Sequence, residues 1–197
     1  MRICLYGASS NEIAPLYITA TENLGEAIAM GGHSLIYGGG ASGLMGAAAR
    51  GVVRKGGKVI GVAPSFFNAD GVLFKGCSEI IYTETMRERK RIMEDGADAF
   101  VMVPGGIGTF DEFFEIITLK QLGRHNKPVA VFNINGYFDE LGAMLDKAVN
   151  QGFMTEKSKK LAPFFSNALK LIDYLENAPD VQSEYDLNTF KRIYDDI

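Results

Sequence analysis

The strongest constraint on the fold is one stretch in the middle of the chain, Asp98–Thr118. Ala99–Val103 is an apolar run without alternation, which is typical of a parallel strand covered on both faces. Pro104 ends this strand because proline cannot donate to a sheet ladder, and the glycines after it allow a sharp turn and close approach of a ligand. A helix follows. The stretch therefore predicts a helix N-terminus at the carboxyl end of a strand, where free N–H groups bind an anion, usually phosphate.

The start of this helix gives one glutamate two possible roles. Thr109 is the expected N-cap, and Glu112, three residues later, completes a capping box. In that role Glu112 contributes on the order of 1 kcal/mol to helix stability. In the other role its carboxylate faces a ligand, one helical turn from the glycine loop. The two roles have comparable weight, and Glu112→Gln separates them, because glutamine keeps the capping bond but cannot act as a base.

Strands and helices alternate along the rest of the chain. The other expected strands are Arg2–Gly7, His33–Tyr37, Lys58–Val62, Glu79–Tyr82, Pro128–Phe132 and a short one that ends at Phe164. The other expected helices are Ile13–Met30, one from the Gly38–Gly46 turn to about Lys55, Thr83–Asp95, Phe138–Asn150 and Asn167–Leu175. This order predicts an α/β fold, a doubly wound parallel sheet with helices on both faces and ligands at the carboxyl ends of its strands.

The length favours a single domain that is large enough to bury a substantial core. We expect residues 1–178 of the 197 to form a single nucleotide-binding α/β domain and the polar residues 179–197 a tail without an assigned role. Within this tail, Leu187–Tyr194 is either a marginal helix or a segment that packs on a partner. The net charge of −4 argues against a nucleic-acid surface. Two cysteines give no disulfide framework, and neither a membrane span nor a signal region is visible, so we expect a cytoplasmic protein.

Several common sites are not expected. Gly38, Gly40 and Gly43 fit the G-x-G-x-x-G spacing, which is a weak signal alone. Because Val59–Val62 is followed by Ala-Pro and not by an acidic residue, a mononucleotide or sugar phosphate fits better than NAD or FAD. The sequence lacks a P-loop and a G-x-S-x-G elbow. The two histidines stand apart from other metal ligands, so we expect no metal and no redox cofactor.

Two further helical patterns bear on the site. Met86–Arg91 is a dense basic run, which is either a solvated face paired with Glu84 and Glu88 or a source of one or two cations for a phosphate or ribose in the crevice. The central helix is apolar nearly all round, which favours a buried helix or a subunit interface over a cofactor box. Its apolar residues are Phe113, Phe114, Ile116, Ile117, Leu119 and Leu122. We expect a symmetric homodimer that covers this helix.

These motifs together resemble one family. Pro104–Glu112 is similar to the PGGxGTxxE signature of the LOG (Lonely Guy) family, the cytokinin riboside 5′-monophosphate phosphoribohydrolases that are often mislabelled lysine decarboxylases. Met86–Lys90 resembles the family's MHxRK motif, and Gly38–Gly46 its GGGxxGLMG segment. Gln121–Val129 and Asn135–Phe138 match further segments, so that the resemblance runs from about Ile3 to Phe153. The joint occurrence of two separated motifs is specific.

The resemblance implies a Rossmann-like fold, a homodimer and a nucleotide 5′-monophosphate in the crevice. It maps the catalytic residues to Arg89 and Glu112. It maps nucleotide contacts to Lys90, Gly105, Gly106, Ile107, Gly108, Thr109, Phe110, Asp111 and Thr118. The chain departs from the family at Arg87, where histidine is usual, and at Leu119, where tryptophan is common. Asn68–Glu79 also matches poorly, which leaves the base specificity open.

The expected reaction is hydrolysis of the N-glycosidic bond of an adenosine 5′-monophosphate, with or without an N6 substituent, to free base and ribose 5-phosphate. The transition state of such a reaction is oxocarbenium-like. Glu112 would stabilise the cationic sugar, and either Asp111 or Glu115 is available as a second carboxylate. The alternatives are a general AMP nucleosidase and a non-catalytic nucleotide sensor. A pyridoxal-phosphate decarboxylase fits worst, since no lysine is singled out for a Schiff base.

Overall fold

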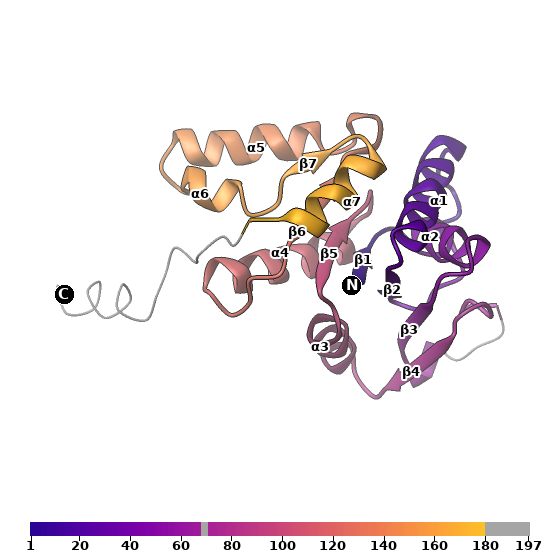
Figure 1. Ribbon diagram of the computed structural model, residues 1–197. Helices are drawn as coiled ribbons and strands as arrows, with labels where there is room; N and C mark the ends of the chain where they lie inside the picture. Colours follow the sequence, from indigo (N-terminus) through magenta and orange to yellow (C-terminus); the bar gives the residue numbers. More distant parts are fainter. Residues whose placement is uncertain (68–70, 180–197) are drawn as a thin grey trace.

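The computed structural model describes residues 1–67 and 71–179, which are built around one parallel sheet (Figure 1). Its strands are β1 Arg2–Tyr6, β2 Ser34–Tyr37, β3 Val59–Pro64, β4 Glu79–Thr83, β5 Ala99–Met102, β6 Val129–Phe132 and β7 Phe164–Phe165. The strand order is β4-β3-β2-β1-β5-β6-β7, and every neighbouring pair is parallel. The helices are α1 Pro15–Met30, α2 Gly43–Arg54, α3 Met86–Gly96, α4 Ile107–Gln121, α5 Asp139–Asn150, α6 Glu156–Lys159 and α7 Ala168–Asn177, with single 3-10 turns η1 Ser65–Phe67 and η2 Ile134–Gly136.

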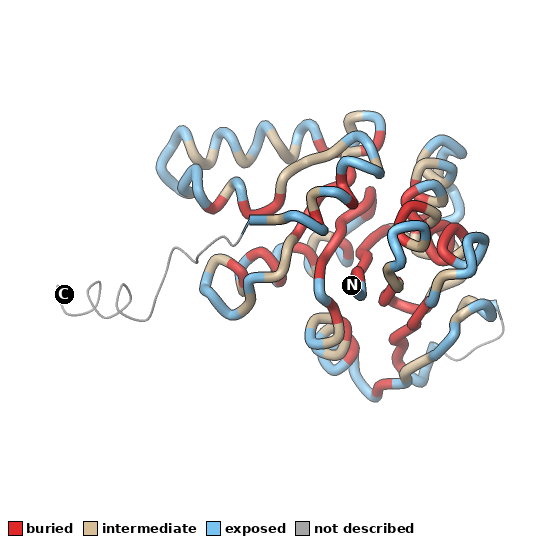
Figure 2. The backbone as a smooth tube through the Cα atoms, in the orientation of Figure 1, coloured by how far each residue is buried: buried red, intermediate tan, exposed pale blue. Residues whose placement is uncertain are grey.

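Helices cover both faces of the sheet, so the inner strands β3, β2, β1, β5 and β6 are buried along most of their length (Figure 2). β1 shows the reason for its unbroken apolar sequence: Ile3 and Leu5 belong to the core under α1, α2 and α7, while Cys4 and Tyr6 belong to the core under α3 and α4. Successive side chains of a strand point to opposite faces, and here each face is packed. The predicted doubly wound α/β fold is confirmed.

The strand order reverses beside β1. The chain moves outward from β1 through β2 and β3 to β4, and α3 then carries it back to β5 on the other side of β1. The loops after β1 and β5 therefore diverge and leave the ligand crevice typical of such sheets. The Ala8 N–H donates to the Pro104 carbonyl over 3.0 Å and holds these two loops at one point.

The predicted elements are found, with ends that differ by a few residues. α1 begins at Pro15 and not at Ile13, and α3 begins at Met86 and not at Thr83. The short α6, which no sequence pattern signalled, lies between α5 and β7. The segment Leu187–Tyr194 lies outside the described residues. Within the described part of the chain, no helix combines the length and apolarity needed to cross a membrane.

Candidate active site

The N-terminus of α3 sets the direction of its basic side chains. The Thr85 hydroxyl accepts a hydrogen bond from the Glu88 N–H over 3.1 Å, and the Glu88 carboxylate accepts one from the Glu84 N–H over 2.8 Å. These bonds cap the helix in the manner of a capping box. With the helix started here, Arg89 and Met93, one turn apart, face the core and are buried.

The basic run therefore divides between the two roles that its sequence allowed. Arg87 and Arg91 are exposed, as expected for a solvated face. Arg89 and Lys90 instead turn towards α4 and pair with its carboxylates.

Arg89 is held by neighbours from three elements: α4, β3 and the loop after β2. Its side chain is only 7% exposed, and Nη1 donates to Glu112 Oε1 over 2.8 Å. Its Nε donates to the Val62 carbonyl at the end of β3 over 3.1 Å. A Cβ at Gly38, just after β2, would lie 1.9 Å from Nη2, so the guanidinium needs glycine at that position. No sequence pattern indicated that this glycine makes room for an arginine.

Glu112, from the second turn of α4, is the buried partner of this arginine. Its side chain is 12% exposed. Burial raises the pKa of the Glu112 carboxyl above its ordinary value, and the Arg89 guanidinium opposes that rise. The arrangement is a carboxylate paired with a guanidinium, both largely removed from solvent, where charge interactions are stronger than at the surface.

The predicted capping box at α4 is wrong. The helix begins at Ile107 with Gly106 as its N-cap, and no side chain accepts a capping hydrogen bond. Thr109 is already inside the first turn, where it is buried against Gly105: a Cβ on that glycine would lie 2.1 Å from Thr109 Oγ1. Because the N-cap is Gly106 and not Thr109, Glu112 stands in the second turn, away from the free N–H groups, and its carboxylate accepts from Arg89 instead.

The two glycine-led helices differ in whether their N-termini are occupied. At α2, the Gly43 N–H donates to Asn11 Oδ1 over 3.2 Å, and the N–H groups of Leu44 and Met45 donate to the Ala8 carbonyl over 2.9 and 3.3 Å. The protein itself thus satisfies the first three N–H groups of α2, which are therefore not available to a phosphate.

At α4 the first-turn N–H groups have no such partner. In residues 1–67 and 71–179 no acceptor lies within hydrogen-bond range of the N–H groups of Ile107, Gly108 and Thr109, and the first helical bond runs from Phe110 to Gly106 over 3.0 Å. Gly106, Ile107 and Gly108 are exposed at the switch point of the sheet. Free N–H groups at a helix N-terminus favour an anion, so the geometry of this loop is compatible with the predicted phosphate contact.

Lys90 belongs to a separate group of charges on the exposed side of α4. Its Nζ lies 2.6 Å from Glu115 Oε2 and 3.1 Å from Asp111 Oδ2. Hydrogen bonding to Glu115, and then to Asp111, raises the pKa of Lys90. Phe110, also expected to bind nucleotide, is half-buried and packs on Phe138.

One predicted contact does not join the others within a single chain. Thr118 is exposed on α4, roughly 16 Å along the helix axis from Ile107 at 1.5 Å per residue. It lies at the rim of two hollows. A shallow one of about 600 Å³ on the outer face of α4 is lined by Lys90, Ile107, Asp111, Thr118 and their neighbours.

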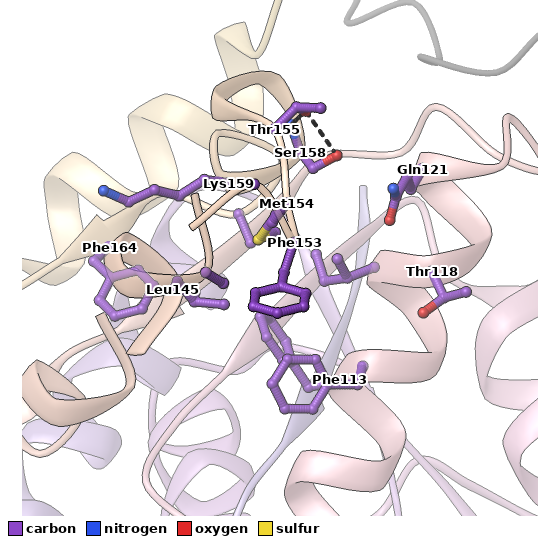
Figure 3. A pocket seen from close by; sticks show the side chains of 15 residues that line it. Phe113, Thr118, Gln121, Leu145, Phe153, Met154, Thr155, Ser158, Lys159 and Phe164 are labelled. Carbon is purple, nitrogen blue, oxygen red and sulfur yellow. Dashed lines mark hydrogen bonds between the residues drawn. The ribbon is translucent and has the colours of Figure 1, made fainter. Parts of the chain in front are cut away.

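The second hollow, of about 420 Å³, lies between α4, α5 and α6 (Figure 3). Thr118 and Gln121 of α4 stand across it from Leu145 and Lys159, with the ring of Phe153 between. Neither hollow is lined by Arg89 or Glu112. Within the described ranges, no group of three or more His, Cys, Asp or Glu residues is placed to hold a metal ion.

Comparisons with known proteins agree with these motifs. A family model described as "Possible lysine decarboxylase" matches residues 45–175. The cytokinin riboside 5′-monophosphate phosphoribohydrolase LOG7 of Arabidopsis thaliana is 36% identical over 196 residues, covering 100% of this chain and 89% of the relative. LOG2 of the same plant is 37% identical over 175 residues, covering 89% and 82%.

The chain belongs to the LOG family. Its fold is also found in solved structures at lower identity. A molybdenum cofactor binding protein from Rippkaea orientalis matches with a TM-score of 0.69 and 22% identity, covering 89% of this chain and 95% of the other. A molybdenum cofactor carrier protein from Chlamydomonas reinhardtii matches with a TM-score of 0.67 and 22% identity, covering 89% and 96%. At that identity the likeness shows that this LOG-family chain shares their Rossmann-like fold.

Proposed function

We propose that this protein is a cytoplasmic phosphoribohydrolase that cleaves the N-glycosidic bond of an adenosine 5′-monophosphate, including N6-modified forms, to free base and ribose 5-phosphate. The observation that carries this proposal is the buried Arg89–Glu112 pair next to the unoccupied N–H groups at the start of α4. The names of the relatives, which are phosphoribohydrolases matched over most of this chain, support it.

Each part of the site has a role in this reaction. The N–H groups of the loop Gly105–Thr109 hold the 5′-phosphate, and Asp111 and Lys90 border the same end of α4. Phosphate binding away from the reacting bond then aligns the ribose. As the bond from C1′ to the base breaks, positive charge develops on the sugar, and the Glu112 carboxylate stabilises it. Water adds to C1′ and the base leaves with a proton, while Arg89 keeps Glu112 ionised and in place.

We further propose a homodimer across the outer face of α4. Ile107 is 88% exposed and Phe114 is 40% exposed, and both lie on this face beside Thr118. In a two-fold pair of antiparallel α4 helices, Thr118 of one subunit lies near the anion loop of the other, which accounts for a nucleotide contact so far from Ile107 in its own chain. Phe114→Glu is expected to give monomers by sedimentation and to lower activity. A fully active monomer would exclude this arrangement.

The reaction is tested by following base release from AMP and from isopentenyladenosine monophosphate by chromatography. We expect release from at least one nucleotide, with a loss of at least about 100-fold in Glu112→Gln and Arg89→Ala, as for removal of a group that stabilises transition-state charge. Glu140→Gln, the same substitution at an exposed site on α5, is the control and should keep full activity. Release from AMP alone indicates an AMP nucleosidase. Tight binding of AMP without release indicates a nucleotide sensor and refutes the enzyme.

A further inference from the structure

A tightly constrained turn follows β6, the strand next to β5 in the sheet. Asn135 has a φ of 51° and Gly136 a φ of 70°, so the backbone reverses through the left-handed region. The Asn133 side chain fixes both sides of the reversal, since its Oδ1 accepts from the Phe138 N–H over 2.8 Å and its Nδ2 donates to Asp139 Oδ1 over 2.7 Å. Tyr137 lies between Gly136 and Phe138, so these constraints leave its backbone little conformational freedom.

Tyr137 points at the anion loop. Its hydroxyl donates to the Gly105 carbonyl over 2.8 Å. Its ring meets Tyr17 of α1 edge to face at 6.1 Å and Phe138 at 4.9 Å between centroids. Although 42% of Tyr137 is exposed, Gly105 is buried, so its carbonyl depends on this hydroxyl for a partner.

The bond also determines where a neighbouring donor points. The Gly105 carbonyl and the Gly106 N–H belong to one planar trans peptide and therefore point in opposite directions. With the carbonyl held towards Tyr137, the Gly106 N–H is directed away from Tyr137, and Gly106, Ile107 and Gly108 are exposed. The Thr109 side chain packs against Gly105 and limits rotation of the Gly105–Gly106 peptide.

We propose that Tyr137 is a positioning residue for the phosphate: its hydroxyl orients the Gly105–Gly106 peptide so that the N–H groups at the start of α4 are aligned on the anion before it binds. This inference rests on the proposed phosphate site. A loop aligned in advance binds its anion without first having to become ordered. A tyrosine that only satisfied a buried carbonyl would affect stability, but would not distinguish ligands with phosphate from those without it.

The test compares two ligands on Tyr137→Phe, which removes the hydroxyl and keeps the ring. Ribose 5-phosphate and adenosine are titrated by calorimetry, and base release from AMP by the wild type and by the variant is measured alongside. We expect affinity for ribose 5-phosphate to fall about tenfold, the size expected when one hydrogen bond that orders the loop is lost, and affinity for adenosine to stay within about twofold. The KM for AMP should rise by more than kcat falls.

Tyr17→Phe is the matched control, because among the described residues no hydrogen bond joins the Tyr17 hydroxyl to the loop. It should bind both ligands as the wild type does. Equal losses for the two ligands in Tyr137→Phe, or no loss, would overturn the inference, and so would a wild type that does not bind ribose 5-phosphate. A selective loss of ribose 5-phosphate binding in a protein that releases no base would support Tyr137 while refuting the proposed enzyme.

Discussion

The buried pair of Arg89 and Glu112 makes a quantitative prediction. Arg89→Met removes the cation and its hydrogen bonds to Glu112 and to the Val62 carbonyl, while an unbranched apolar chain still fills the space of the arginine's methylene groups. Removing one member of a buried ion pair costs about 3–5 kcal/mol, because the other charge is left without compensation. We therefore expect the free energy of unfolding to fall by about 4 kcal/mol at pH 7.

The size of this loss should depend on pH in a defined direction. Burial already raises the pKa of Glu112 above its ordinary 4.5 with Arg89 opposing it, so without the arginine that pKa rises further. Between 4.5 and the raised value, the folded variant binds a proton that the unfolded chain does not. Its stability therefore increases as the pH falls through this window, by at most about 1.4 kcal/mol per unit. The deficit against the wild type should be smaller at pH 5 than at pH 8.

Urea denaturation of four proteins at both pH values measures these terms: the wild type, Arg89→Met, Glu112→Gln and the double variant. The double variant should be more stable than Arg89→Met at pH 8, since no isolated carboxylate remains buried. A double variant as unstable as the sum of the two single changes would refute the reasoning. A deficit of Arg89→Met that is the same at pH 5 and pH 8 would refute it as well.

Three further outcomes are expected. Gly38→Ala should lower base release at least about tenfold, because its methyl group displaces Arg89 Nη2. Gly142→Ala on α5 is the control and should not lower it, since a Cβ there meets Phe164 only at 3.7 Å. Base release by both variants is measured with saturating AMP. The acid limb of kcat/KM should lie above pH 4.5, because the free enzyme needs Glu112 ionised and burial raises its pKa; a limb at or below 4.5 would contradict this. His125, whose pKa burial lowers to about 4, should stay neutral at pH 6, and an NMR titration that shows half-protonation near 6.5 would contradict its buried position.

The same local pattern forms a cap in one helix but not in another, where the cap predicted from it is wrong. Threonine followed three residues later by glutamate occurs at Thr85 and Glu88 and again at Thr109 and Glu112. At the first site the glutamate caps the helix. At the second it turns to Arg89, more than twenty residues earlier in the chain. The Thr-x-x-Glu spacing predicts hydrogen bonds within one helix. It does not show which side chain from another helix will pair with the same carboxylate.

The strand order shows which glycine turns lie side by side, and the sequence pattern did not predict this. Alternating strands and helices predicted a parallel sheet and placed glycine turns at the carboxyl ends of its strands, but they did not say which turns meet. Because β5 lies beside β1, Ala8 reaches both Pro104 and the N-terminus of α2, and it closes the latter with its carbonyl. Gly38 makes room for the Arg89 guanidinium and not for a phosphate. The start of α4 resembles a dinucleotide loop less than the start of α2 does, yet the N–H groups of α4 are the ones without a partner among the described residues. The difference arises because the Ala8 carbonyl accepts hydrogen bonds from the N-terminus of α2.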